Sequence, residues 1–122
     1  MYSKMAMDHF LRPRYARALA GPGVATGRAT NGACGDTATF FVREVAGTVE
    51  VGFQCQGCAG AIAACSAAAE AVAGRATAGC HAPDASELAA LLAPWPAEKA
   101  GCTAMAAQAL ALAMRAAGVV GA

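Results

Sequence analysis

The stretch Thr37-Ala-Thr-Phe-Phe-Val-Arg-Glu-Val45, followed by Ala46-Gly47-Thr48 and Val49-Glu-Val-Gly-Phe-Gln-Cys55, decides the fold of this chain. The first segment is rich in β-branched and aromatic residues, and the last alternates apolar and polar side chains, as strands do. The short glycine-containing link between them is typical of a tight turn. The sequence therefore predicts an antiparallel hairpin, with Val24–Thr30 as a weaker third strand beside it.

Helices are expected on both sides of this β region. Pro13 should end the opening helix, and residues 15–23 should form a loop. Gly74 is a plausible end of the alanine-rich helix that follows the hairpin, and Pro94-Trp95-Pro96 separates the last two helices. The expected helical ranges are 1–10, 58–73, 86–92 and 102–117. The order of helix, strands and helices indicates an α+β fold, a small antiparallel sheet of about three strands with helices packed on one face.

Length and charge limit the classes of function. The chain has 122 residues, enough for one domain over residues 1–122. A net charge of +1 gives no reason to expect nucleic acid or an anionic membrane surface as a partner. No apolar signal segment is evident, and the longest uncharged stretch, residues 51–69, is interrupted by polar residues and glycines. We therefore expect a soluble, cytoplasmic protein.

The six cysteines point to metal or thiol chemistry. Without a signal segment they are not expected to form a structural disulfide framework. Cys34, Cys58 and Cys102 stand at the edges of expected elements, each beside a glycine that lets the backbone approach a bulky inorganic group. Cys58 and Cys102 begin helices, where unpaired N–H groups should lower the pKa of a thiol.

Asp36 completes a candidate metal site with these three cysteines. It follows Cys34 by two residues, and on an extended chain such positions share a face. Three thiolates and one carboxylate suit tetrahedral zinc. They equally suit iron in a cluster, with the carboxylate oxygen as the weakest ligand. The residue types thus leave the identity of the metal open.

Several motifs in order match a known family. They are Tyr2-Ser3-Lys4, Asp8-His9-Phe10, Ala33-Cys34-Gly35-Asp36, Gly57-Cys58-Ala59-Gly60, and Lys99 with Cys102. The chain resembles the IscU-type iron–sulfur cluster assembly scaffolds, including the N-terminal domain of NifU, nearly end to end. The resemblance implies a SufE/IscU-like fold with a mobile N-terminal helix, in a protein that is not an enzyme.

The resemblance also implies roles for the site residues. Cys34, Cys58 and Cys102 would be cluster ligands and sulfur acceptors, and Asp36 would keep a transient [2Fe-2S] cluster transferable. A cysteine desulfurase would supply the sulfur, and iron–sulfur acceptor or carrier proteins would receive the cluster.

Two departures from the family pattern bear on partners and metal. The usual scaffold has a histidine where this chain has Gly101, which keeps open the alternative of a zinc-bound, SufU-like persulfide acceptor that stimulates a cysteine desulfurase. The segment Trp95-Pro96-Ala97-Glu98-Lys99 retains little of the usual chaperone-recognition motif. This argues against recognition by a dedicated Hsp70-type chaperone.

The remaining candidates each have a plain interpretation beside a functional one. Cys55 forms a CxxC motif with Cys58, so it is either an incidental strand residue or a resolving thiol, and a thiol redox protein is the third hypothesis. Lys99 is either a solvated lysine or a cation that offsets thiolate charge. We expect Cys65 in the core, Cys80 and His81 in an exposed loop, Trp95 against the core, and His9 at the surface or a partner contact. The sequence leaves open the assembly pathway, the oligomeric state and the acceptor proteins.

Overall fold

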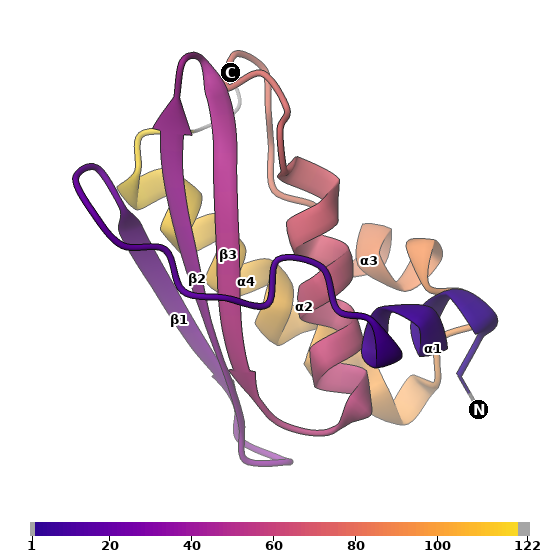
Figure 1. Cartoon of the computed structure of the whole chain (residues 1–122). Helices are drawn as coiled ribbons and strands as arrows, with labels where there is room; N and C mark the ends of the chain where they lie inside the picture. The colour runs from indigo at the N-terminus through magenta and orange to yellow at the C-terminus, as the bar shows by residue number, and fades with distance from the viewer. Residues whose placement is uncertain (1, 120–122) are drawn as a thin grey trace.

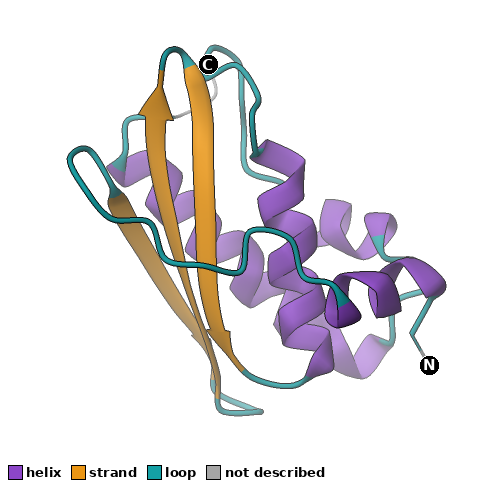
Figure 2. Ribbon diagram, in the orientation of Figure 1, coloured by secondary structure: helices purple, strands orange, loops and turns teal. Residues whose placement is uncertain are grey.

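The computed structural model describes residues 2–119, and Figure 1 shows a sheet with a layer of helices against one of its faces. The three strands are antiparallel in the order β1-β2-β3. Figure 2 shows that the strands are consecutive in the chain and that helices precede and follow them. The elements are α1 (Lys4–Leu11), β1 (Ala25–Asn31), β2 (Asp36–Val45), β3 (Thr48–Gln56), α2 (Ala59–Val72), α3 (Ala85–Leu91), a 3-10 turn (Ala97–Lys99) and α4 (Ala100–Ala116). The predicted α+β class, with a three-stranded antiparallel sheet, is confirmed.

The hairpin of β2 and β3 has the register that a two-residue turn dictates. Val45 pairs with Thr48, and the two residues between them, Ala46 and Gly47, have φ of 52° and 79°. Positive φ at both positions matches the right-handed twist of the flanking strands. Every second residue of β2 from Asp36 to Val42 is buried. Asp36 therefore begins the row that faces the helices, so its carboxylate points into the protein.

Small side chains let the helices pack close to the sheet. α4 contacts β1 and β2, while α2 contacts β3. At Gly27 in β1 an added Cβ would overlap the backbone of α4 at Ala109 and Ala113, so only glycine permits this approach. The largest fully buried side chains come from the sheet, α3 and α4, and they include Phe40, Phe53, Leu88, Leu92, Met105 and Leu110.

α1 packs against α2 and is fastened at both ends. Ser3 caps α1 by accepting a hydrogen bond from Ala6 N at 3.0 Å, and its hydroxyl donates to Leu92 O at 2.9 Å. His9 is only 3% exposed, and its Nδ1 lies 2.7 Å from Ser66 Oγ on α2. The expectation that His9 lies at the surface is wrong, because this face of α1 is the one that covers α2. The mobility of α1 stays a prediction.

The segment between α1 and β1 crosses the sheet face opposite the helices (Figure 1). Phe53 N on β3 donates to Tyr15 O at 2.9 Å. A Cβ at Gly52 would overlap the carbonyl of Arg17, so the loop lies directly against the strand there. Within residues 2–119, no helix combines the length and apolar character that crossing a membrane would require.

Candidate metal centre

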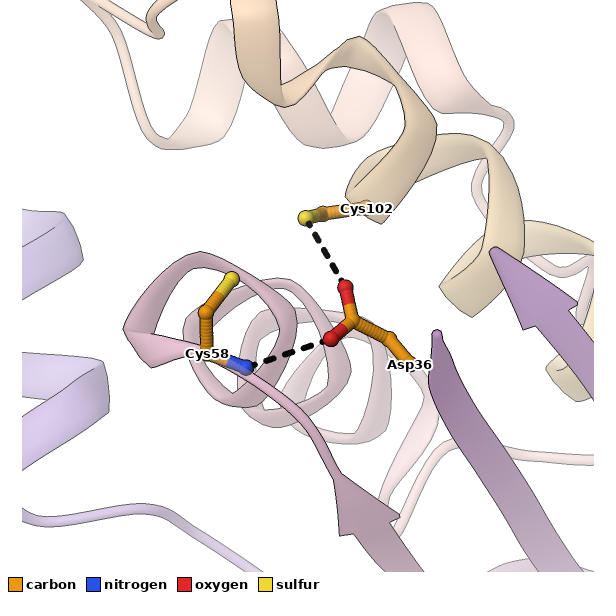
Figure 3. Close-up of side chains that lie close together, drawn as sticks. All are labelled: Asp36, Cys58 and Cys102. Carbon is orange, nitrogen blue, oxygen red and sulfur yellow. Dashed lines mark hydrogen bonds between the residues drawn. The ribbon is translucent and has the colours of Figure 1, made fainter. Parts of the chain in front are cut away.

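Three of the four predicted ligands meet at one end of the sheet. Figure 3 shows Asp36, Cys58 and Cys102 pointing toward one another from three different elements. Asp36 is the first residue of β2, Cys58 is the N-cap of α2, and Cys102 lies in the first turn of α4. One ligand atom from each lies within 4.8 Å of the others. Sulfur ligands around one tetrahedral zinc stand about 3.8 Å apart, as follows from zinc–sulfur bonds of about 2.3 Å. The three ligand atoms would therefore have to move only slightly closer together to bind one metal ion.

Asp36 is the centre of the group. It is 3% exposed, its Oδ1 accepts a hydrogen bond from Cys58 N at 3.3 Å, and its Oδ2 lies 3.9 Å from Cys102 Sγ. The neighbouring Gly57 is fitted to this carboxylate, because a Cβ there would lie 2.6 Å from Asp36 Oδ1. The backbone at residues 57–58 therefore holds the carboxylate between the two thiols.

Of the two thiols in this group, Cys58 is the better prepared to ionise. Burial opposes its ionisation, but the backbone N–H groups of Ala61 and Gly60 at the helix N-terminus and the ammonium of Lys99 favour it, so the pKa of Cys58 falls below its ordinary value. Lys99 Nζ lies 3.5 Å from Cys58 Sγ. The same contact raises the pKa of Lys99. Of its two interpretations, the geometry favours a cation that offsets thiolate charge.

The pKa of Cys102 is shifted in the direction opposite to the one expected from the sequence. Burial, reinforced by the nearby Cys58 and Asp36, raises the pKa of Cys102 to about 12. The expectation of a lowered pKa is wrong because α4 starts at Ala100, which leaves Cys102 inside its first turn and 0% exposed. Loss of solvation and neighbouring negative charge outweigh the helix N-terminus here. A metal ion would have to displace the proton from this thiol.

Cys34 lies outside the group of three. It is exposed in the turn that links β1 to β2, where the N–H groups of Cys34 and Gly35 donate to Asn31 O at 3.2 and 2.8 Å. Gly35 has φ of 72°, so the backbone between Cys34 and Asp36 is not extended. The two side chains therefore do not share a face as the i, i+2 spacing predicts. Cys34 is nevertheless tethered two residues from Asp36, at the tip of a hairpin beside the centre.

Asn31 is a neighbour of the site that sequence reasoning missed. A Cβ at Gly101 would lie 2.8 Å from both Nδ2 and Oδ1 of Asn31, so the Asn31 amide rests against the residue that precedes Cys102. The signal that could have pointed to Asn31 is the pairing of β1 with β2, in which Asn31 lies opposite Asp36. The space beside Cys102 where the family pattern has a histidine side chain is thus bordered by an asparagine from β1.

Tyr2 and Trp95 form an aromatic wall next to Lys99. Their ring centroids are 5.6 Å apart, and Trp95 Nε1 donates to Lys99 O at 3.0 Å. The expectation that Trp95 packs against the core is confirmed. Burial raises the pKa of Tyr2, and a Cβ at Gly60 would lie 2.7 Å from its hydroxyl. Sequence reasoning did not place Tyr2 at the site.

The other three cysteines do not belong to this group of three. Cys65 is fully buried in α2 as expected, and Cys55 of β3 is half-buried. The prediction that Cys80 is exposed is wrong, since it is 9% exposed and packs against the core, whereas His81 beside it is exposed. The role of Cys55 as a resolving thiol stays a prediction.

Comparison with known proteins identifies the family. Residues 1–117 match the NifU-like N terminal domain. The chain belongs to this family. It is 41% identical over 81 residues to the bifunctional protein NifU/MnmA of Rubrobacter xylanophilus, an alignment that covers 64% of this chain and 16% of that relative. The present NifU-like domain thus spans a small part of that protein's length.

Solved structures agree on the fold. A NifU-like protein (N-terminal) from Brucella abortus superposes with a TM-score of 0.69 at 22% identity, covering 95% of this chain and 93% of the other. A putative iron–sulfur cluster assembly scaffold protein for the SUF system from Fervidobacterium islandicum superposes with a TM-score of 0.67 at 17% identity, covering 93% and 96%. The predicted NifU-type resemblance and its α+β fold are confirmed.

Proposed function

We propose that this NifU-like domain is an iron–sulfur cluster assembly scaffold, which builds a labile [2Fe-2S] cluster and passes it to acceptor or carrier proteins. The observation that carries the proposal is the convergence of Asp36, Cys58 and Cys102 from three elements onto one point. Membership of the NifU-like family supports it, as does the fold shared with a putative cluster scaffold of the SUF system. We expect the protein to act without catalysing a reaction of its own, in the reducing cytoplasm where free thiols persist.

The four proposed ligands have different parts in binding iron. Cys58 offers a thiolate at a lower proton cost than Cys102, since the pKa of Cys58 is lowered and that of Cys102 is raised. Cys102 ligates only when iron replaces its proton. Cys34, exposed on its turn, would swing toward Asp36 to complete the set. Asp36 supplies a hard oxygen beside soft thiolates, and such a mixed set binds a cluster less tightly than four thiolates would.

The same cysteines are proposed to accept sulfur from a cysteine desulfurase. A thiolate of the scaffold attacks the outer sulfur of the desulfurase persulfide, the new S–S bond forms on the scaffold, and the desulfurase thiolate leaves. Cys34 and Cys58 are accessible for this attack, whereas Cys102 is 0% exposed. Transfer to Cys102 would need a local opening around the first turn of α4.

Anaerobic reconstitution tests this function. The protein is incubated with ferrous iron and sulfide, and the charge-transfer absorption in the visible range is recorded. Cys34→Ser, Cys58→Ser and Cys102→Ser should each lose it, whereas Cys80→Ser, the matched control at a buried position outside the centre, should keep it. Loss of absorption in Cys80→Ser alone, or its survival in all three ligand variants, would contradict the assignment. Asp36→Ala should retain its cluster longer when mixed with an apo-ferredoxin acceptor.

Zinc is the second candidate for the same residues. The absence of a histidine at Gly101 and the compact group of one carboxylate and two thiols favour a zinc-bound persulfide acceptor that stimulates a desulfurase. Metal analysis of protein purified without oxygen separates the two functions. One tightly held zinc per chain without iron, together with faster desulfurase turnover, supports the zinc form. Iron with acid-labile sulfide supports the cluster scaffold.

A further inference from the structure

The outer edge of β3 is covered at two points and open at its end. Val49 N donates to Arg75 O at 2.8 Å. Phe53 N donates to Tyr15 O at 2.9 Å. The backbone groups of an antiparallel strand alternate in direction, so Cys55, two residues after Phe53, also points its N–H and C=O away from β2. Within residues 2–119 no backbone group from another segment pairs with them. The sheet edge therefore keeps one donor and one acceptor open at Cys55.

A cavity of about 610 Å³ reaches this open end, and its volume lies within the size range of small-molecule sites. Cys55 lines the cavity, while the Cys55 side chain packs against the core. Pro13, Ala16 and Ile62 supply apolar lining. The polar lining consists of one guanidinium, two hydroxyls and two amides, from Arg28, Thr37, Thr39, Gln54 and Gln56.

The polar lining is ordered across the three strands. Arg28 on β1 pairs with Thr39 on β2, and Thr39 pairs with Gln54 on β3. Residues paired across strands lie on the same face of a sheet, so these three side chains form one row. Among the described residues that line the cavity, none carries a carboxylate. The cavity therefore offers a guanidinium without a competing anion, and a guanidinium is the side-chain group best suited to hold a carboxylate.

We propose that this cavity binds a short peptide with a free C-terminal carboxylate. A backbone amide of the peptide pairs with the N–H and C=O of Cys55, as an added strand would. The carboxylate accepts hydrogen bonds from the Arg28 guanidinium. β1 and β3 lie two strand spacings apart, about 10 Å. The Arg28 side chain and a peptide of two or three residues, about 7–10 Å when extended, together span this distance.

The short length of the open edge favours a free peptide over a longer strand from a protein. β3 ends at Gln56, so only residues 54–56 lie beyond the contact between Phe53 and Tyr15. Pro13 and Ala16, on either side of Tyr15 in the chain, line the cavity. A longer added strand would have to displace this segment. The site is independent of the metal centre, since the proposed contacts use none of the candidate ligands.

Titration of ¹⁵N-labelled protein with acetylglycylleucine, which has two secondary amides and a carboxylate, tests the site by NMR. The Cys55 N–H signal should shift saturably. The C-terminal carboxamide of the same compound should bind about fivefold more weakly, because it cannot pair with Arg28 as a carboxylate does. Arg28→Gln should abolish this preference. Arg115→Gln, at an exposed arginine on α4 that does not line the cavity, should preserve it. Equal affinity of the wild-type protein for acid and carboxamide, or no saturable shift, would overturn the proposal.

The backbone contact is tested from both sides. Cys55→Pro removes only the outward N–H, which an edge strand tolerates, and it should weaken binding several-fold, whereas Cys55→Ala should bind as the wild type does. Acetylsarcosyl-N-methylleucine, methylated at both amides, should bind the wild-type protein several-fold more weakly, and this measurement requires no variant to fold. Unchanged affinity of the methylated compound would contradict the edge pairing. Tighter binding of the same dipeptide at the C-terminus of a carrier protein would contradict a free peptide as the ligand.

Discussion

Gly57→Ala should disturb the candidate metal centre without replacing any of its ligands. The new Cβ would lie 2.6 Å from Asp36 Oδ1, 2.9 Å from Asp36 Cγ and 2.9 Å from the Cβ of Ala61. Real Cβ contacts are longer than this, so the carboxylate has to move away from Cys58 N, from which it accepts a hydrogen bond. The change therefore acts on the position of Asp36 alone among the proposed ligands.

The size of the effect follows from two opposing contributions. Overpacking in a well-packed site destabilises by about 1–3 kcal/mol. Replacing glycine with alanine also restricts the unfolded chain, which stabilises the fold by about 0.4–1 kcal/mol. We expect a net loss of roughly 0.5–2 kcal/mol in the free energy of unfolding, measured by urea denaturation of the metal-free protein. Metal affinity, measured by titration with Co²⁺ as a spectroscopic substitute for zinc, should fall as well.

Matched variants separate the clash from a general effect of alanine. Gly32→Ala is the control, because a Cβ there meets nothing within 4 Å: its stability should rise by about 0.4–1 kcal/mol through the unfolded chain, and its Co²⁺ affinity should stay at the wild-type value. In an Asp36→Ala background the clash with the carboxylate is gone, so Gly57→Ala should destabilise by about 1 kcal/mol less than it does in the wild-type background. Unchanged stability and unchanged Co²⁺ affinity in Gly57→Ala would refute the fitted position of the Asp36 carboxylate.

Three further predictions concern the surroundings of the site. Burial, with a smaller contribution from Arg14, lowers the pKa of His9 below its unfolded value. The stability that neutral His9 confers is therefore complete above about pH 6.5 and is lost as the pH falls toward the folded pKa. His9→Gln should flatten this pH dependence of the free energy of unfolding, measured by urea titrations between pH 5 and 7, and an unchanged slope would contradict the prediction. Lys99→Met should raise the pKa of Cys58 and slow its alkylation by iodoacetamide at pH 7 about twofold to tenfold, with the exposed Lys4→Met as the control that leaves the rate unchanged. Gly101→His should destabilise the fold by about 1–3 kcal/mol through its contact with Asn31, and Asn31→Gly should recover part of that loss in thermal unfolding, since removing the amide opens the space.

Much of the fold could be predicted from local sequence patterns. The alternation in residues 49–55 and the Ala46-Gly47 link were enough for the hairpin, because strand pairing and turn conformation depend on neighbouring residues. The position of Cys58 at a helix N-terminus followed from the alanine-rich segment after it, and its lowered pKa agrees with that position. These properties are encoded within a few residues of chain.

The assembled site depended on contacts between distant segments. Whether Cys102 ionises is decided by its burial and by charges from β2 and α2, and these reversed the effect expected from its place in the helix. The burial of His9 against Ser66 arises where α1 meets α2. Asn31 reaches Gly101 only because β1 is laid against α4.

The sequence by itself therefore determined which residues are candidates for the chemistry, and only the tertiary structure decided how they are grouped. Residue type and spacing identified Cys34, Asp36, Cys58 and Cys102. Packing brought Asp36, Cys58 and Cys102 together and left Cys34 exposed on its turn. The physical reason is that a side chain's solvation and its distant neighbours are set by the packing of helices on the sheet, which no local pattern contains.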